Sequence, residues 1–246
     1  MSESPPFHER RNKTALITGS AKRLGAICAK RLHERNYNVI VHYQSSTSEA
    51  EKLVNSLNAR RKNSAVALKA DFLDSMSVKH LAEQSVNLWD GVDVLVNNAS
   101  LFYPESIANT EEASWDALLG CNLKAPFFLS KALTPCLSKR DGCIVNIVDI
   151  HSERGLPGYP VYSIAKAGLE AMTRILAKEL APAIRVNGVS PGAILWPVEG
   201  SSDLAQQEIL ARIPLQRIGS PEDIANAVVF LCCEADYMTG QILKVD

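Results

Sequence analysis

The feature that most constrains this chain is a regular alternation, starting at Thr14, of short apolar runs with longer amphipathic stretches. Short apolar runs bounded by turn residues predict buried strands, and the longer amphipathic stretches predict helices. The predicted strands are residues 14–19, 38–43, 65–70, 92–98, 143–148, 184–190 and 241–245. The predicted helices are residues 24–35, 47–61, 75–89, 111–137, 160–180 and 221–233, and Pro126 marks where the fourth could be interrupted.

Strands that alternate with helices form βαβ units, which build parallel sheets. The pattern therefore predicts an α/β fold, a single-domain Rossmann fold with a doubly wound, seven-stranded parallel sheet and helices on both faces. We assign the domain to residues 13–246 and expect residues 1–12 to be a flexible polar tail. In such sheets the ligand lies at the carboxyl ends of the strands, so the residues that follow each strand are the candidates for function.

Composition excludes several other classes of protein. The net charge is −1 and the basic residues are scattered, which argues against binding to nucleic acid or to a membrane surface. No stretch has the length of a signal peptide core or a membrane span, so we expect a cytoplasmic protein. The six cysteines show no metal-binding spacing, and we expect reduced, mostly buried thiols and no metal site.

Three segments at the expected ligand edge fit a dinucleotide. The first strand is followed by TGSAKRLG (18–25), in which Gly19 and Gly25 flank a strand-to-helix turn that could hold a pyrophosphate. Asp71 and Phe72 follow the third strand, where a carboxylate could accept from an adenine amino group. Asn97-Asn98-Ala99 follows the fourth. Each segment alone could also be an ordinary packing turn.

The residues after the second strand indicate which cofactor is bound. An enzyme selective for NAD usually has an acid there, but this strand ends in His42-Tyr43-Gln44-Ser45-Ser46. Lys22 and Arg23 place cations nearby, and the serines can donate hydrogen bonds to a 2′-phosphate. The pattern favours NADPH, and the alternative is that Lys22 and Arg23 are solvated loop charges.

Tyr162 and Lys166 are the candidate reactive pair. They are four residues apart at the start of a predicted helix and so share one face. An ammonium near a phenol stabilises the phenolate, so we expect Lys166 to lower the pKa of Tyr162 from its usual value of about 10. Tyr159 has Ser163 four residues on instead of a lysine, so we expect it to shape the pocket or pack. Thirteen residues before Tyr162 stands Asp149.

These motifs together resemble the short-chain dehydrogenase/reductase family from about Lys13 to Asp246. The matching elements are TGSAKRLG, the Asn-Asn-Ala segment, Asn122, Tyr162 with Lys166, and Ser190-Pro191-Gly192. The resemblance implies that Lys166 also holds the nicotinamide ribose, that Asn122 helps to order a proton-relay water, and that hydride passes to a carbonyl or imine carbon. The cofactor-binding residues it implies are Gly19, Lys22, Arg23, Leu24, Gly25, His42, Tyr43, Ser45, Ser46, Asp71, Phe72, Asn98, Ala99, Ser100, Lys166, Pro191, Gly192 and Ile194.

Two departures from the family pattern point to one branch. Arg23 replaces the middle glycine of the turn, and Asp149 replaces the usual serine. Both occur in the pteridine reductases, which the chain resembles in TGSAKRLG, NNASLFYP and GYPVYSIAK. That resemblance implies that Phe102 stacks the pterin against the nicotinamide, that Ser100 contacts substrate or cofactor, and that Arg23 reaches both phosphate and pterin. Asp149 and Tyr162 would form a coupled proton-transfer pair beside the pterin nitrogens.

The sequence thus predicts an NADPH-dependent pteridine reductase with Asp149, Tyr162, Lys166 and Asn122 as catalytic residues. The alternatives are a dihydromonapterin or dihydrofolate reductase of the same type, a generic carbonyl or 3-oxoacyl reductase, and a non-catalytic NADPH-binding sensor. Ser45 stands where relatives carry an arginine for the 2′-phosphate, and Pro214-Leu215-x-Arg217-x-Gly219 resembles the generic family. Residues 192–204 should cover the substrate. By analogy we expect a homotetramer packed through residues 111–137 and 160–180.

Overall fold

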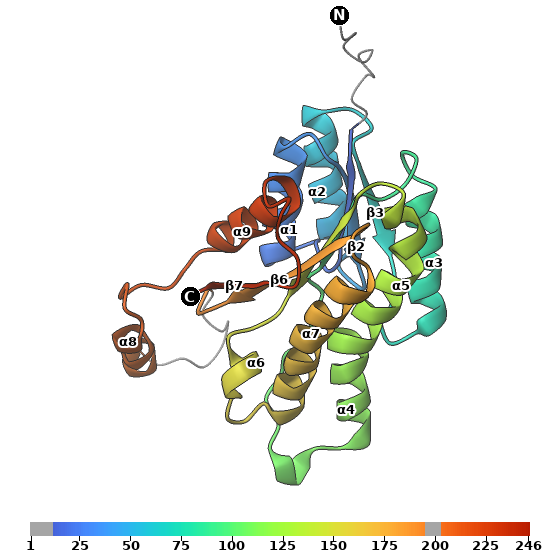
Figure 1. The fold of residues 1–246 in the computed structure, drawn as a ribbon. Coiled ribbons are helices and arrows are strands. Elements are labelled where there is room, and N and C mark those ends of the chain that lie inside the picture. The colour runs from blue at the N-terminus through green and yellow to red at the C-terminus, as the bar shows by residue number, and fades with distance from the viewer. Residues whose placement is uncertain (1–11, 195–202) are drawn as a thin grey trace, which may run out of the picture.

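A computed structural model describes residues 12–194 and 203–246 of the protein, and its centre is one parallel sheet (Figure 1). The strands are β1 (Thr14–Ile17), β2 (Asn38–Tyr43), β3 (Ala65–Lys69), β4 (Val94–Asn97), β5 (Cys143–Ile147), β6 (Arg185–Pro191) and β7 (Ile242–Val245). Their order is β3-β2-β1-β4-β5-β6-β7, and every neighbouring pair is parallel. The order reverses between β1 and β4, which is where a doubly wound sheet opens its ligand crevice.

Helices cover both faces of the sheet, as predicted (Figure 1). The helices are α1 (Arg23–Glu34), α2 (Thr47–Arg60), α3 (Ser75–Val86), α4 (Glu112–Leu119), α5 (Ala125–Ser138), α6 (His151–Arg154), α7 (Pro160–Glu179), α8 (Asp203–Arg212) and α9 (Pro221–Cys233). Buried side chains of α1, α2 and α9 form one core with the strands. Those of α3 and α5 form a second core on the opposite face.

The most accurate predictions concern elements with strong local signals. The predicted bounds of β2 and α9 match the structure. Ser220 accepts from the backbone N–H of Asp223 at 3.2 Å, and the Asp223 carboxylate accepts from the Ser220 N–H at 2.8 Å. This capping box, with Pro221 in the first turn, fixes where α9 begins.

The predicted helix 111–137 is not continuous. It consists of α4, a π-helical turn at Gly120–Lys124 (η2), and α5. Pro126 lies just after this π-helical turn, so the change from α-helical to π-helical hydrogen bonding lies where a proline cannot donate a backbone N–H. The helices α6 and α8 and a 3₁₀ turn at Ile107–Asn109 were not predicted.

The remaining expectations about the chain as a whole can be checked in part. All six cysteines are free thiols, and Cys232 and Cys233 lie in α9 as expected. Within the described residues, no helix is both long and apolar enough to span a bilayer. The expected N-terminal tail, apart from residue 12, lies outside the described residues, as does the part of the substrate-covering segment from residue 195 to residue 202.

Candidate active site

The glycine turn after β1 packs directly against the segment after β4. Gly19 has a φ of +60°, and a Cβ atom there would lie 2.8 Å from the Cα atom of Ala99. A Cβ atom on Gly25 would lie 2.6 Å from the side-chain nitrogen of Asn98. Neither position accommodates a side chain, so both glycines are required for this close approach.

Hydrogen bonds join the same two segments. The Thr18 hydroxyl accepts from the backbone N–H groups of Asn98 at 2.9 Å and Ala99 at 3.0 Å. The Asn98 side chain donates to the carbonyl of Thr18 at 2.8 Å and to that of Gly19 at 3.1 Å. In the described part of the chain no side chain caps the N-terminus of α1, so its first N–H groups suit an anion. The turn therefore fits a dinucleotide pyrophosphate.

The His42 side chain is hydrogen-bonded within the protein and supports the glycine turn. Its ring is buried, Nδ1 accepts from the backbone N–H of Gly19 at 3.0 Å, and Nε2 lies 3.2 Å from the carbonyl of Ala70. Burial lowers the pKa of His42 to about 4, so the ring is neutral and Nε2 carries the proton. His42 therefore acts here as a positioning residue for the glycine turn, and its predicted contact with the cofactor stays a prediction.

Asp71 and Phe72, which follow β3, differ in the exposure of their side chains. The Asp71 side chain is exposed, and its Oδ1 accepts from the Gln44 side chain at 3.0 Å and from the Leu73 N–H at 2.9 Å. The Phe72 ring is buried and stacks on His42, with ring centroids 4.4 Å apart. Asp71 therefore remains a candidate for the adenine, whereas the Phe72 ring packs inside the protein against His42.

The two predicted phosphate-binding cations, Lys22 and Arg23, differ in their contacts and backbone conformation. Lys22 forms a 3.1 Å ion pair with Glu49, a residue in the first turn of α2 that the sequence analysis did not consider. Arg23 is exposed and has a φ of +52°, a conformation that favours glycine. An arginine kept at a glycine-preferring position is the kind of backbone strain that functional sites carry.

The reactive residues meet as the sequence predicted. The Tyr162 hydroxyl donates a 2.6 Å hydrogen bond to Oδ2 of Asp149, and Oδ1 of Asp149 accepts from the His151 N–H at 2.8 Å. Lys166 is buried and donates from Nζ to the Ile147 carbonyl at 2.7 Å. Asp149 therefore lies in direct hydrogen-bond contact with the tyrosine hydroxyl.

The structure reverses the expected direction of one pKa shift. Burial, followed by the charge of Asp149 and the hydrogen bond to it, raises the pKa of Tyr162 instead of lowering it. Lys166 does not offset this shift, since its Nζ lies 5.8 Å from the centroid of the tyrosine ring and its hydrogen bond goes to the backbone. Burial lowers the pKa of Lys166 itself to about 8. The raised pKa keeps Tyr162 a protonated phenol at neutral pH.

Three polar contacts hold α7 in register against β5 and its extension. Besides the Tyr162–Asp149 and Lys166–Ile147 pairs, the side chain of Asn146 donates to the Thr173 hydroxyl at 2.9 Å. Residues 146, 147 and 149 pair with residues 173, 166 and 162, so the strand and the helix run in opposite directions along this ladder of contacts. Asn146 and Thr173 are fully buried, so they anchor the inner end of the ladder.

Asn122 and Phe102 shape the mouth of the site. The Asn122 side chain, buried in the π-helical turn, pairs with both backbone groups of Leu101 at 2.9 Å. It therefore positions the loop that carries Ser100 and Phe102. The ring of Phe102 is 53% exposed and lies parallel to Tyr159 at 4.5 Å between centroids. Tyr159 thus packs in the site, as predicted, and the ring of Tyr162 makes a T-shaped contact with Phe102 at 4.8 Å between centroids.

The segment after β6 closes the edge of the site. The Pro191 carbonyl accepts from the Ile150 N–H at 3.2 Å, and the Gly192 N–H donates to Val245 at 2.8 Å. Ile194 packs beside Gly219. The predicted cofactor residues not yet described, Leu24, Tyr43, Ser45, Ser46 and Ser100, lie on the turns and strand ends at this same edge.

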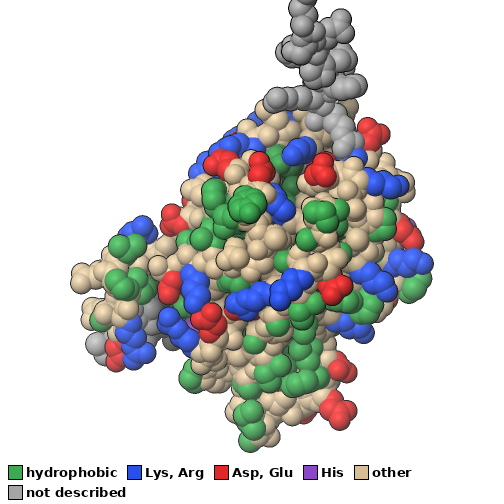
Figure 2. All heavy atoms as spheres, viewed as in Figure 1, with side chains coloured by type: hydrophobic (Ala, Val, Ile, Leu, Met, Phe, Trp, Pro, Cys, Tyr) green, Lys and Arg blue, Asp and Glu red, His purple; other side chains and the backbone are tan. Residues whose placement is uncertain are grey.

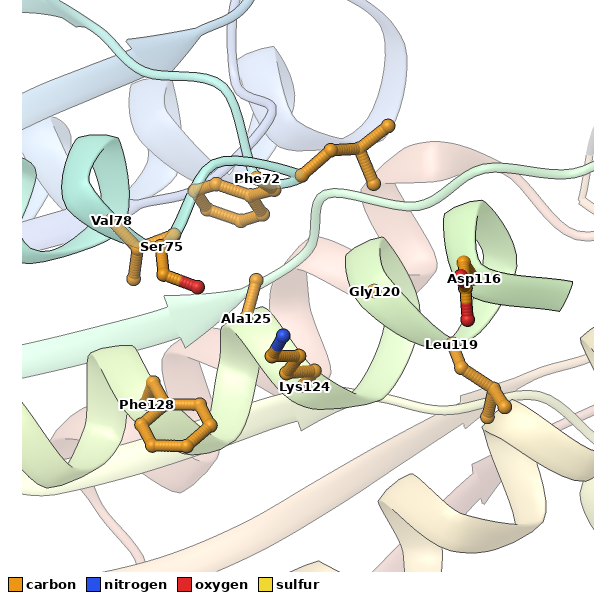
Figure 3. Close-up of a pocket in the computed structure, with 10 residues that line it drawn as sticks. Phe72, Ser75, Val78, Asp116, Leu119, Gly120, Lys124, Ala125 and Phe128 are labelled. Carbon is orange, nitrogen blue, oxygen red and sulfur yellow. The ribbon is translucent and has the colours of Figure 1, made fainter. Parts of the chain in front are cut away.

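A cavity of about 350 Å³ lies beside the site but contains none of the reactive residues (Figure 3). Its walls include Phe72, Val78, Asp116, Lys124 and Phe128, contributed by the segment after β3, by α3 and by the helices from α4 to α5. Phe72 is the one predicted site residue among its lining. Among the described residues, no group of three or more His, Cys, Asp or Glu side chains is placed to hold a metal ion.

Comparisons with known proteins agree with this geometry. A family model described as enoyl-(acyl carrier protein) reductase matches residues 19–246. The chain is 37% identical to the 3-oxoacyl-(acyl-carrier-protein) reductase of Staphylococcus epidermidis, over 96% of this chain and 98% of the relative. It is also 37% identical to pteridine reductase 1 of Leishmania tarentolae, over 94% of each. Identity over the whole chain therefore does not separate these two activities.

Proposed function

The chain belongs to the short-chain dehydrogenase/reductase family of oxidoreductases, and we propose that it is an NADPH-dependent pteridine reductase. Its substrates would be oxidised or dihydro pterins, with folates as a related class, which are reduced to the tetrahydro forms. The observation that carries the proposal is the 2.6 Å hydrogen bond from Tyr162 to Asp149, at the position where the family usually has a serine.

The chemistry of the two substrate classes explains why this residue matters. A ketone reductase needs a neutral hydroxyl donor to polarise a carbonyl oxygen. A pterin presents ring nitrogens and N–H groups, toward which a carboxyl group can accept a hydrogen bond or pass a proton. A carboxylate beside a ketone oxygen would instead oppose the negative charge that develops on it. Asp149 therefore favours the pterin.

The roles of the other residues follow from their positions. NADPH would supply the hydride, and the turn at 18–25 would hold its pyrophosphate. Lys166 would hold the nicotinamide ribose, and Tyr162 would deliver the proton, with Asp149 as its partner. Asn122 positions the loop of Ser100 and Phe102. A protein that only senses NADPH would not require Tyr162, Lys166 and Asp149 together.

Two further features support a flat, polar substrate. The ring of Phe102, 53% exposed beside Tyr162, offers an aromatic surface on which a pterin ring can stack. Arg23 is exposed and held in a glycine-like conformation, which fits a role in contacting substrate and phosphate.

A 3-oxoacyl reductase is the second candidate. It is favoured by the equal 37% identity to such an enzyme and by the Arg217-x-Gly219 segment, which resembles the generic family. A dihydromonapterin or dihydrofolate reductase of the same type would share Asp149 and differ in the pocket. These candidates differ in substrate and not in cofactor chemistry.

We also propose a homotetramer packed through α4, α5 and α7. Large apolar side chains on these helices remain exposed, namely Trp115, Phe127, Phe128, Ile164 and Ile175, at 40–57% of their surface. Figure 2 shows hydrophobic side chains gathered along the lower part of the visible face, where Figure 1 places α4, α5 and α7. Light scattering tests the assembly. A cytoplasmic location remains a prediction from the sequence.

NADPH oxidation followed by absorbance tests the function, with dihydrobiopterin, dihydrofolate and a simple 3-oxo ester as parallel substrates. We expect turnover with the pterin and little with the ester. Turnover with the ester alone would contradict the proposal and identify a 3-oxoacyl type of reductase. Binding of NADPH with no turnover of any substrate would favour the non-catalytic sensor.

A further inference from the structure

We propose that Glu49 weakens the preference of this protein for NADPH over NADH by engaging Lys22, the cation that a 2′-phosphate would otherwise bind. The inference rests on the proposed function, because it concerns the same dinucleotide site. It adds a specificity-determining residue that is not part of the predicted cofactor set.

The pair lies between the two elements that flank the expected adenosine ribose. Lys22 precedes α1, which follows β1, and Glu49 lies in the first turn of α2, which follows β2. The ammonium of Lys22 is 3.1 Å from Oε1 of Glu49. In doubly wound folds the residues after the second strand contact the ribose 2′ position. Lys22 and Glu49 therefore meet beside the place expected for that position.

The carboxylate of Glu49 is well held at this point. Its own backbone N–H and the side chain of Lys22 lower its pKa, and Lys52 adds a further positive charge nearby. The side chain of Ser46 does not cap the N-terminus of α2. Among the described residues, Glu49 is the acidic residue in the first turn of this helix, where a negative charge is favourable. A 2′-phosphate would have to share both the cation and the helix end with it.

The two cofactors respond to this carboxylate in opposite ways. A phosphate group carries between one and two negative charges at neutral pH, so it is repelled by Glu49 and competes with it for Lys22. A free 2′-hydroxyl is neutral and can donate a hydrogen bond to a carboxylate, as in NAD-selective enzymes. Glu49 thus disfavours NADPH and favours NADH, while Lys22 and Arg23 act in the other direction.

Exposure limits the size of the effect. The side chains of Lys22 and Glu49 are 52% and 44% exposed, and charges in such positions interact weakly and are screened by salt. We therefore expect a change in the affinity ratio of about three- to tenfold rather than a complete reversal of selectivity.

Direct binding to the full chain tests the inference without any substrate. The Kd values of NADPH and NADH are measured by fluorescence titration for the unmodified protein, for Glu49→Gln and for Glu51→Gln. Glu51 is exposed on the same helix and provides the matched control. We expect Glu49→Gln to bind NADPH about three- to tenfold more tightly, with NADH binding unchanged or weaker, and Glu51→Gln to leave the ratio unchanged.

A second variant tests whether the effect runs through Lys22. In Lys22→Met, the substitution Glu49→Gln should raise the NADPH affinity by a smaller factor than in the unmodified protein, because competition for Lys22 is already lost and only the direct repulsion between carboxylate and phosphate remains. An unchanged NADPH-to-NADH ratio in Glu49→Gln, or equal changes for both cofactors, would overturn this inference and leave the proposed function intact. Binding of neither dinucleotide by the unmodified protein would overturn both.

Discussion

The hydroxyl of Tyr162 donates a 2.6 Å hydrogen bond to Asp149, thirteen residues earlier in the chain, and burial together with that carboxylate raises the pKa of the tyrosine. The tyrosine therefore stays protonated at neutral pH, and the proton lies between two groups that can exchange it. A serine at this position would supply a hydroxyl but would add no negative charge. In the proposed function, this contact is what ties the residue at position 149 to a pterin substrate.

Replacing Asp149 should change which substrate is reduced. We expect Asp149→Ser to lower kcat/KM for dihydrobiopterin by about 100-fold or more, because the coupled proton partner of Tyr162 is lost. The same variant should gain activity on a 3-oxo ester, since the new hydroxyl can polarise a carbonyl. Asp149→Asn keeps an acceptor for the His151 N–H and should lose pterin reduction without gaining the ester. Undiminished pterin reduction in both variants would show that Asp149 is incidental.

Removing the hydroxyl of Tyr162 should separate chemistry from binding. We expect Tyr162→Phe to lower kcat by at least about 100-fold, because the variant has no group to deliver the proton. Its Kd for NADPH, measured by fluorescence, should stay within about threefold of the parent value, since the ring and Lys166 remain. Tyr159→Phe keeps the ring that stacks on Phe102 and should retain most of the activity. Comparable losses in the two variants would argue against the assigned donor.

The pH profile of kcat/KM should show the titration of Lys166. Burial lowers its pKa to about 8, so the ammonium is lost as the pH rises through that value, and activity should fall on the alkaline side. The negative charge of Asp149 raises the pKa of Lys166, so Asp149→Asn should move this alkaline limb to lower pH. Asp116→Asn removes an exposed acid on α4 and should not move it. A limb unaffected by Asp149→Asn would mean that a group other than Lys166 titrates.

Replacing Arg23 tests whether its strained backbone conformation serves cofactor and substrate binding. Its φ of +52° suits glycine, so Arg23→Gly should raise the free energy of unfolding by up to about 1 kcal/mol. The same change should weaken binding of NADPH and raise the KM for the pterin, because the cation is removed. Urea unfolding and fluorescence titration measure the two effects. A variant that is less stable and binds equally well would show that the arginine serves the fold.

Thr173 should anchor the register of α7. We expect Thr173→Val to lower the free energy of unfolding by about 1–3 kcal/mol, because the buried Asn146 side chain loses its acceptor. Thr173→Ser keeps the hydroxyl and should recover most of the loss. Thr134→Val removes a half-buried hydroxyl that only returns to its own helix, and its effect should be small. Urea unfolding of the three variants measures this. If Thr173→Val and Thr134→Val lost the same free energy of unfolding, the Asn146–Thr173 contact would not contribute more to stability than an ordinary helix hydroxyl.

The sequence alone determined the features that depend on local chemistry. Hydrophobic periodicity placed all seven strands, and the predicted bounds of α9, residues 221–233, match the structure. The spacing of Tyr162 and Lys166 is a local property of one helix, so their shared face followed from the sequence. The resemblance to a known family added Asp149 as the informative exception. Each of these signals is contained in a few neighbouring residues.

The tertiary structure decided everything that depends on which distant residues meet. Lys22 and Glu49 form an ion pair across two βα units, and the buried rings of His42 and Phe72 stack on each other. The direction of the Tyr162 pKa shift reversed because it depends on burial and on the relative distances of Asp149 and Lys166. The side chain that a given residue contacts, and how far water is excluded from it, are set by packing between elements, which no local pattern encodes.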